Sequence, residues 1–284
     1  QGRSVSWVLT ERRHASPPPK RLLARLALFR FSRPVFEVTR TIAASDTPGR
    51  TDGPQGEAGW PVRLRGVTFG HAGHPDLLRG IDLTVTPGSF NFLTGRSGAG
   101  KSVLVQMIAG LVRPHAGQVV LFGQDRAHLT RRERTALRRR IGLIAQDDPL
   151  IGHLSVIDTL AVTLRLTGQD PRGRTADLQD MLAFVGLTDM ADRPASTLSR
   201  AERRLVALAR AMMTGPELIL ADEPLAGLDA VSAKRMLGLL RTLHRQGATL
   251  VMTRDGEGAG PEVRKGDRRL HLEAGRLVEP ERAR

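Results

Sequence analysis

Short stretches of alternating and continuous hydrophobic residues in the middle of the chain predict an α/β fold. Residues 62–64 and 81–85 alternate between apolar and polar side chains, which predicts two antiparallel strands. The apolar run at 90–93 predicts a buried strand, and residues 102–111 follow it with the pattern of a helix. A sheet with an antiparallel edge and at least one covering helix is therefore expected.

The second half of the chain continues in the same manner. An arginine-rich helix is predicted over 130–140, and residues 147–196 are mostly helical in pattern. Apolar runs without alternation are typical of parallel strands that are covered on both faces. Further strands are predicted at 119–122, 141–144, 218–221 and 249–252. The whole pattern is that of an α/β protein with a parallel core, an antiparallel edge and a helical subdomain at about 147–200.

The first sixty residues have a different composition. Residues 16–20 form a proline run, and residues 43–59 are rich in Gly, Pro, Ser, Thr and Asp, as disordered linkers are. Between them, residues 20–31 are compatible either with a short basic helix at a membrane surface or with a disordered tail or misassigned start. We expect an Arg/Pro-rich, disordered extension over 1–60, one α/β domain over 61–279 and a tail over 280–284.

Charge and composition narrow the function classes. The chain has 43 Lys and Arg residues against 29 Asp and Glu, a net charge of +14. This excess favours either polyanionic partners or a general arginine bias of surface residues. Cysteine is absent, which excludes disulfides and thiolate metal sites. No apolar run approaches the roughly 20 residues that span a bilayer. With 4% aromatic residues and no nucleic-acid reader motif, no nucleic-acid partner is expected, and the 130–140 helix is interpreted as a solvated face.

A glycine-rich loop lies between the predicted strand at 90–93 and the helix after it. The loop fits the pattern G-x-x-x-x-G-K-[ST] at every position. Glycines let the backbone aim its N–H groups at phosphate oxygens, and the start of the helix adds a positive dipole end. Lys101 is expected to bind the β- and γ-phosphates, and the Ser102 hydroxyl to coordinate Mg²⁺. The predicted ATP-binding residues here are Gly95, Arg96, Ser97, Gly98, Ala99, Gly100, Lys101, Ser102 and Val103.

An acidic pair follows the apolar run at 218–221. Asp222 comes at the carboxyl end of this predicted strand, where ligands of α/β proteins bind, and is expected to hold the metal. Glu223 is placed to orient or deprotonate the attacking water. Together with the P-loop, the pair is interpreted as a Walker B element, so ATP and Mg²⁺ are the predicted cofactors.

In order and spacing these motifs resemble the ATP-binding subunits of ABC transporters over residues 62–279. The resemblance implies the α/β fold of a P-loop NTPase of the ABC type, with a RecA-like parallel core, and one ATP-binding domain over 61–279. Gln146 matches the Q-loop glutamine that contacts the metal and γ-phosphate. Asp229 lies in the segment 226–229 that matches the D-loop, and residues 275–277 match the terminal turn and strand. His71 takes the place of the tyrosine that stacks on adenine, although a solvated histidine explains it nearly as well. The residues at the signature position, which acts on the partner copy's ATP, are Ser199, Arg200, Ala201 and Glu202.

Within the family, residues 92–102, 141–147 and 220–224 are most similar to the FtsE-like cell-division ATP-binding proteins. The ATPases of lipoprotein release and macrolide export share much of the same sequence in these segments. The resemblance implies an ATPase that is peripheral on the cytoplasmic face of the inner (plasma) membrane. It also implies an integral FtsX-like membrane partner and a homodimer or heterodimer of ATP-binding domains.

Three features depart from the family pattern. Arg200 and Ala201 replace the two signature glycines, and Arg254 stands in place of the switch histidine. A permanently charged arginine cannot copy the histidine directly; it either stabilises transition-state charge or slows hydrolysis. The helix expected after the switch is replaced by a glycine-rich stretch at 255–261. Glu223 and Arg254 are the expected catalytic residues, and Ser102, Gln146 and Asp222 the expected metal ligands.

Overall fold

The computed structural model describes residues 59–147, 150–256 and 263–278. The predicted extension before residue 59, its possible helix at 20–31, the tail at 280–284 and most of the glycine-rich stretch 255–261 lie outside the described residues.

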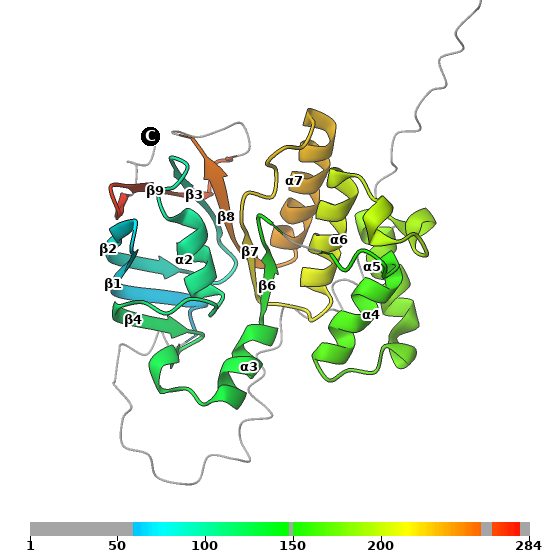
Figure 1. Ribbon diagram of the computed structural model, residues 1–284, viewed down its shortest axis with the longest axis horizontal. Helices are drawn as coiled ribbons and strands as arrows, with labels where there is room; N and C mark the ends of the chain where they lie inside the picture. The colour runs from blue at the N-terminus through cyan, green and yellow to red at the C-terminus, as the bar shows by residue number, and fades with distance from the viewer. Residues whose placement is uncertain (1–58, 148–149, 257–262, 279–284) are drawn as a thin grey trace, which may run out of the picture.

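A mixed six-stranded sheet forms the centre of the described chain, in the order β10-β9-β3-β8-β7-β6 (Figure 1). Neighbouring strands from β9 to β6 run parallel, and only β10 is antiparallel to β9. The strands are β3 (Phe90–Gly95), β6 (Ile141–Ile144), β7 (Leu218–Ala221), β8 (Thr249–Asp255), β9 (Arg268–Glu273) and β10 (Arg276–Val278). The parallel core predicted from the continuous apolar runs is therefore confirmed.

A second, antiparallel sheet packs beside the first, in the order β2-β1-β4-β5. Its strands are β1 (Val62–His71), β2 (His74–Val85), β4 (Ala116–Leu121) and β5 (Gln124–Asp125). The antiparallel edge expected from the alternating segments is confirmed, although β1 and β2 extend well beyond those segments because the hairpin closes at His71 and His74.

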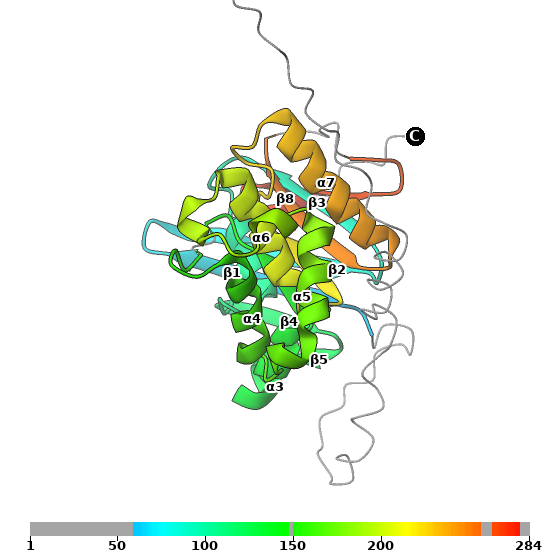
Figure 2. The ribbon, with the colours of Figure 1, turned by 90° about the vertical axis from the view of Figure 1, so that its right-hand side faces the viewer.

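The helices divide between two sides of the central sheet (Figures 1 and 2). In Figure 1, α2 lies on the side of the antiparallel sheet, whereas α4, α5, α6 and α7 gather on the other side. The α-helices are α2 (Lys101–Ile108), α3 (Arg131–Arg139), α4 (Val156–Leu166), α5 (Thr175–Val185), α6 (Arg200–Met212) and α7 (Ala230–Arg245). Short 3-10 turns occur at η2 (Arg126–His128), η3 (Pro171–Arg174), η4 (Thr188–Met190) and η5 (Ala195–Thr197).

Strand β7 shows how the sheet separates two hydrophobic cores. Ile219 and Ala221 are fully buried against the core formed with α4 to α7, while Leu218 and Leu220 face the core shared with α2 and the antiparallel sheet. A strand with both faces buried needs a continuous apolar sequence, which is the pattern that predicted it. Within the described residues, no helix is both long and apolar enough to cross a bilayer.

Strand β9 was not predicted, because Arg268 and Arg269 made the region look like a charged surface segment. In the structure its Leu270 and Leu272 are buried on one side and it pairs with β3. Asp255, assigned to the glycine-rich stretch, instead ends β8. The helical region also continues past residue 200 through α6, which ends at Met212.

Candidate nucleotide-binding site

The carboxyl ends of the parallel strands bring the predicted site residues to one edge of the sheet. The P-loop follows β3, Asp255 ends β8, Asp222 follows β7 and Gln146 comes after β6. Strand register places Gly95 opposite Asp255, and β3, β8, β7 and β6 are consecutive neighbours. Residues far apart in the sequence therefore meet at one edge, where ligands of α/β sheets bind.

The P-loop depends on glycine at both ends. Gly95 has φ of 154°, and a Cβ atom there would lie 2.6 Å from the Leu272 carbonyl oxygen, so no side chain fits. Gly100 is the N-cap of α2 with φ of 103°, in the left-handed region. Between them Arg96, Ser97 and Gly98 are exposed. The loop is thus an open turn that ends at a helix N-terminus, a backbone arrangement suited to phosphate.

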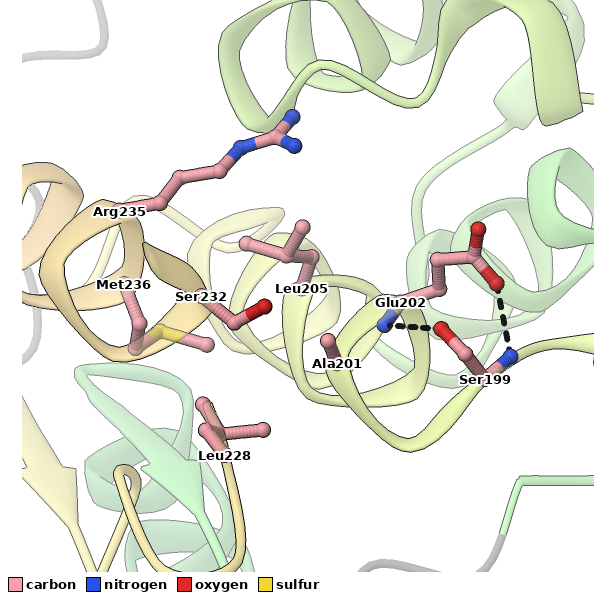
Figure 3. Close-up of a pocket in the computed structure, with 8 residues that line it drawn as sticks. All are labelled: Ser199, Ala201, Glu202, Leu205, Leu228, Ser232, Arg235 and Met236. Carbon is pink, nitrogen blue, oxygen red and sulfur yellow. Dashed lines mark hydrogen bonds between the residues drawn. The ribbon is translucent and has the colours of Figure 1, made fainter. Parts of the chain in front are cut away.

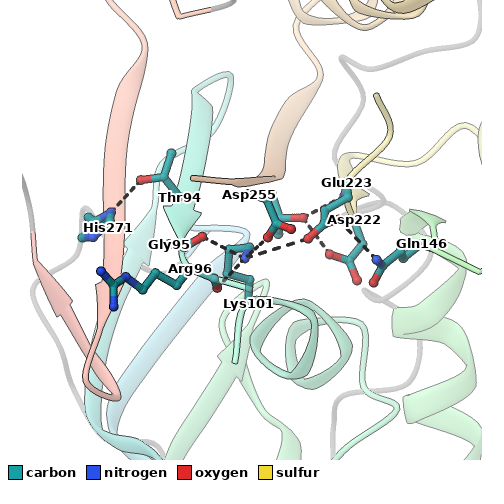
Figure 4. A network of polar contacts seen from close by, with 10 residues as sticks. Thr94, Gly95, Arg96, Lys101, Gln146, Asp222, Glu223, Asp255 and His271 are labelled. Atoms are coloured by element: carbon teal, nitrogen blue, oxygen red, sulfur yellow. Dashed lines mark hydrogen bonds and ion pairs between the residues drawn. The ribbon is translucent and has the colours of Figure 1, made fainter. Parts of the chain in front are cut away.

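Lys101 is held inside the loop by three oxygen atoms (Figure 4). Its Nζ donates to the carbonyl oxygens of Gly95 at 3.0 Å and Arg96 at 2.9 Å, and to Asp255 Oδ1 at 2.6 Å. The Lys101 side chain is 3% exposed. A buried ammonium needs such acceptors, and phosphate oxygens are equivalent acceptors for it.

The Thr253 hydroxyl joins Asp222 and Glu223, the two predicted Walker B carboxylate residues. It donates to Asp222 Oδ1 at 2.6 Å and accepts from the Glu223 backbone N–H at 2.8 Å. Glu223 is one of the few non-glycine residues with positive φ, at 45°. Backbone in this region costs free energy that surrounding contacts must offset, and such positions cluster at functional sites. The Thr253 bond is one contact that holds Glu223 there.

Glu223 sits in an environment that favours its protonated form. Burial raises the pKa of Glu223, and the hydrogen bond and charge of Asp255 raise it further, while Lys101 lowers it. Lys101 Nζ lies 3.9 Å from Glu223 Oε1. The Lys101 hydrogen bond lowers the pKa of Asp255. A glutamate with a raised pKa is a better proton acceptor at neutral pH than an ordinary one, provided that it is ionised.

Gln146 joins the site at this edge, and Arg254 lies on β8 immediately before Asp255. Gln146 Nε2 donates to Glu223 Oε2 at 3.2 Å, so the predicted Q-loop residue does meet the predicted base. Arg254 is half-buried on β8 and opposite Thr94 in the register of β3 and β8. Ser102 and Val103 are half-buried in the first turn of α2. The structure thus brings together Lys101, Gln146, Asp222 and Glu223.

The predicted signature residues form a second cluster, on the helical side. Ser199 is the N-cap of α6, and a capping box joins it to Glu202: Glu202 N–H donates to Ser199 Oγ at 3.3 Å and Ser199 N–H to Glu202 Oε2 at 2.7 Å (Figure 3). Asp229 caps α7 by accepting from the N–H groups of Val231 and Ser232, both at 3.0 Å. Between the two helix starts lies a cavity of about 310 Å³, lined by Ser199, Ala201, Glu202, Leu205, Leu228, Ser232, Arg235 and Met236.

Arg200 lies against the D-loop of its own chain. A Cβ atom built on Gly227 would be 2.2 Å from Arg200 Nη1. The guanidinium therefore occupies the space that a side chain at position 227 would need. The side chain that replaces the first signature glycine therefore packs across the D-loop. This contact links the predicted signature, which was expected to act on a partner copy, to the predicted D-loop.

His71 lies at the tip of the β1–β2 hairpin, where its ring meets that of His74 edge to face with centroids 5.4 Å apart. The hairpin itself adjoins the P-loop, because a Cβ atom on Gly100 would be 3.0 Å from Leu78 and 3.2 Å from Leu77. The adenine-stacking role of His71 stays a prediction.

Sequence reasoning assigned no role to Asp255. The sequence did contain a signal for this residue: Asp255 comes shortly after the apolar run of residues 249–252, and Asp222 likewise comes after the apolar run of β7. What the sequence did not provide was the adjacency of β8 and β3, which places the Asp255 carboxylate on Lys101.

Comparison with known proteins identifies the family. The profile of the ABC transporter family matches residues 78–226 of the 284-residue chain, just over half. The chain belongs to this family, as one of its ATP-binding subunits with the ABC ATPase fold. Among its relatives are the cell division ATP-binding protein FtsE of Escherichia coli K12 and the lipoprotein-releasing system ATP-binding protein LolD 1 of Caulobacter vibrioides. FtsE is 38% identical over 67% of this chain and 86% of its own. LolD 1 is 38% identical over 71% of this chain and 86% of its own length.

The methionine import ATP-binding protein MetN of Leifsonia xyli is also 38% identical, over 77% of this chain. The chain spans 64% of that relative's length and 65% of the MetN of Corynebacterium jeikeium. Among solved structures, the ATP-binding cassette MJ0796, a dimer in a post-hydrolysis state bound to ADP and Pi, superimposes with a TM-score of 0.70. It is 27% identical, and the match covers 78% of this chain and 99% of that one.

Proposed function

We propose that this chain binds and hydrolyses ATP as the peripheral subunit of an FtsE-like membrane complex, on the cytoplasmic face of the inner (plasma) membrane. The observation that carries the proposal is the meeting of Lys101, Asp222, Glu223 and Gln146 at one sheet edge. ATP hydrolysis needs a phosphate cradle, a metal-binding carboxylate and a base for water, and these residues supply one of each.

The residues present fit Mg-ATP. The Lys101 ammonium already lies among oxygen acceptors, and the loop glycines leave room for phosphate against the backbone. Ser102, Gln146 and Asp222 offer the hydroxyl, amide and carboxylate oxygens that Mg²⁺ prefers, directly or through water. When bound, Mg²⁺ neutralises charge on the β- and γ-phosphates. The phosphates would be surrounded by the other residues predicted to bind ATP, namely Gly95, Arg96, Ser97, Gly98, Ala99, Gly100 and Val103.

Glu223 is the proposed general base. Its carboxylate would take a proton from the water that attacks the γ-phosphorus, while the bond to the ADP oxygen breaks and inorganic phosphate leaves. Gln146 holds one carboxylate oxygen of Glu223, which orients the base. General-base catalysis of this kind contributes about 10²–10⁴-fold, so Glu223→Gln should reduce turnover by at least that order.

Arg254 is the proposed second catalytic residue, in place of the switch histidine. It lies on β8 opposite Thr94 of β3, one residue before Asp255. A guanidinium cannot exchange a proton at neutral pH, so it would act by stabilising charge on the transferred phosphoryl group.

A head-to-tail dimer would supply the rest of the site. Ser199, Arg200, Ala201 and Glu202 form a cluster apart from the P-loop, and we propose that they face the ATP of a partner copy, with Asp229 holding the D-loop. The MJ0796 cassette, similar in fold at 27% identity, is dimeric. Either two identical chains or this chain and a better-preserved relative would form the pair.

Among membrane systems we favour an FtsX-like partner and a role in bacterial cell division. The match to FtsE spans 86% of that relative, compared with 64% of MetN. LolD 1 is matched over the same 86%, so an ATPase of lipoprotein release or of another ABC transporter is the alternative. Co-purification of the chain with each candidate membrane protein, produced from the source genome, would decide between them. Retention of the lipoprotein-release partner and not the FtsX-like one would overturn the preference.

A nucleotide-gated scaffold with little hydrolysis is a second candidate, favoured by Arg254 and Arg200 and opposed by the intact Asp222 and Glu223. Phosphate release with Mg-ATP separates the two, with ATP binding measured in parallel and Glu223→Gln, Arg254→His and Lys101→Ala as variants. The enzyme proposal expects turnover that Glu223→Gln abolishes and that Arg254→His does not increase. ATP binding without phosphate release in the wild type, together with turnover restored by Arg254→His, would establish the scaffold instead.

A further inference from the structure

Helix α3 carries a concentration of positive charge that the nucleotide site does not use. Five of its nine residues are arginines: Arg131, Arg132, Arg134, Arg138 and Arg139. In both Figure 1 and Figure 2, α3 projects at the lower end of the molecule. Within the described part of the chain, none of the five forms an ion pair with a carboxylate, whereas the C-cap residue Arg140 pairs with Glu217.

Part of this charge is placed unfavourably for the helix itself. Arg131 and Arg132 occupy the first turn of α3, where the helix dipole disfavours cations. Arg134 and Arg138 are four residues apart, so their like charges face each other on one side of the helix. Glu133 is the single acidic residue of α3, and it is engaged in the capping box with Thr130. The helix dipole favours Arg138 and Arg139 in the last turn, but local stability does not explain the other three arginines.

More arginines adjoin one flank of α3. Arg126 lies in a shallow hollow with Arg134 and Arg138. Its guanidinium is fixed there by bonds to the carbonyl oxygens of Gly110 at 2.7 Å and Val112 at 2.5 Å. Burial lowers the pKa of Arg126, and the charges of Arg113, Arg138 and Arg134 lower it further. This crowding of cations would be relieved by an anion.

Two exposed leucines adjoin these arginines. Leu111, 57% exposed, sits between Gly110 and Val112, the two residues that Arg126 binds. A groove of about 390 Å³ contains Arg138, Arg139 and Leu166, and Leu166 is 79% exposed. Arginines interspersed with exposed leucines are the composition that binds at an anionic lipid surface, with guanidinium groups on phosphates and apolar tips below them.

We propose that the α3 face, defined as the five α3 arginines with Leu111 and Leu166, binds anionic phospholipid headgroups directly. This contact would add to any membrane-protein partner and is separate from the nucleotide site. It accounts for the crowded cations and for the exposed leucines together, which a purely solvated arginine face does not.

The test measures sedimentation of the full chain with vesicles, without nucleotide. Phosphatidylcholine vesicles are compared with vesicles in which about a third of the lipid is phosphatidylglycerol. The triple variant Arg134→Gln, Arg138→Gln, Arg139→Gln should bind the anionic vesicles about tenfold or more weakly, because each arginine near the surface contributes. Leu166→Gln should also weaken binding. The control triple, Arg245→Gln, Lys265→Gln and Arg276→Gln, removes the same charge from exposed positions elsewhere and should change binding little.

Thermal unfolding would verify that both triples fold, and the basic segment before residue 59 is common to all variants. Equal weakening by the two triples would overturn the proposal, since total charge would then explain binding. Vesicle binding that neither triple changes, or absence of binding by the wild type, would also overturn it.

A short DNA duplex serves as a second probe. If the α3 triple weakened DNA binding but not vesicle binding, the face would be a nucleic-acid surface instead.

Discussion

The Lys101 ammonium and the Asp255 carboxylate form an ion pair with an N–O distance of 2.6 Å. Asp255 ends β8, the strand next to β3, and its carboxylate therefore binds the lysine of the P-loop. Lys101 is 3% exposed and Asp255 48% exposed, so the pair is anchored on the lysine side and open to solvent on the other. Phosphate oxygens must compete with Asp255 for the same ammonium. The carboxylate is thus a built-in competitor of the nucleotide.

Asp255→Asn should tighten Mg-ATP binding. Removing the competing charge should lower the Kd about twofold to fivefold, the equivalent of the ~0.4–1 kcal/mol that a partly exposed ion pair contributes. Isothermal titration calorimetry measures it, with Glu273→Gln as a control that removes an exposed carboxylate from β9. Weaker binding by Asp255→Asn alone would mean that Asp255 helps to hold the nucleotide.

Gly227→Ala should destabilise the D-loop by about 1–2 kcal/mol, because Gly227 has φ of 69° in the left-handed region. Part of the loss should come from the contact with Arg200, whose Nη1 lies 2.2 Å from the new Cβ position. Urea unfolding of Gly227→Ala in the wild-type and Arg200→Gly backgrounds separates these effects. A smaller loss in the Arg200→Gly background is expected; an equal loss would show that the guanidinium moves aside without cost.

The buried ion pair between Arg241 and Asp267 should be costly to break. Arg241 Nη1 and Nη2 bind the two Asp267 oxygens at 2.6 and 2.5 Å, and both side chains are nearly buried, at 6% and 5% exposure. Asp267→Ala would remove both of these carboxylate oxygens from the buried Arg241 guanidinium, which lies over Phe90, at a cost of about 3–5 kcal/mol.

The double variant Arg241→Met, Asp267→Leu should recover most of that stability, since an apolar pair of similar volume often replaces a buried ion pair at little cost. Urea denaturation of the two variants provides the comparison. A double variant as unstable as Asp267→Ala would show that the charges themselves are needed.

Stability should depend on pH through the capping box of α3. Hydrogen bonds from Thr130, side chain first and then backbone, lower the pKa of Glu133. A lowered pKa means that the ionised form stabilises the folded state above the ordinary glutamate pKa, and that this contribution is lost as the pH falls through the folded pKa. Glu133→Gln should therefore be less stable than the wild type at neutral pH and equal to it in acid. Unfolding curves from about pH 7 to about pH 3 test this; a constant difference would contradict it.

Buried strands were the most predictable elements. Residues 141–144 and 218–221 were located to the residue, because strands covered on both faces require uninterrupted apolar sequence. Strand β9 was not predicted, because only Leu270 and Leu272 of its six residues face the core and the apolar run is therefore interrupted. The P-loop and the acidic pair were recognised from local spacing. The Lys101–Asp255 pair was not, because it depends on which strands are neighbours, and sequence spacing does not encode that order.

The contact between the P-loop and β9 has a consequence for how the chain is made. Gly95 packs against the Leu272 carbonyl, so one wall of the nucleotide loop comes from a segment 177 positions later. During synthesis the chain emerges from its amino-terminal end, and such distant contacts form late. Nearly the whole domain must leave the ribosome before the loop has its final wall, so a nascent chain should not retain ATP until the last strands are in place.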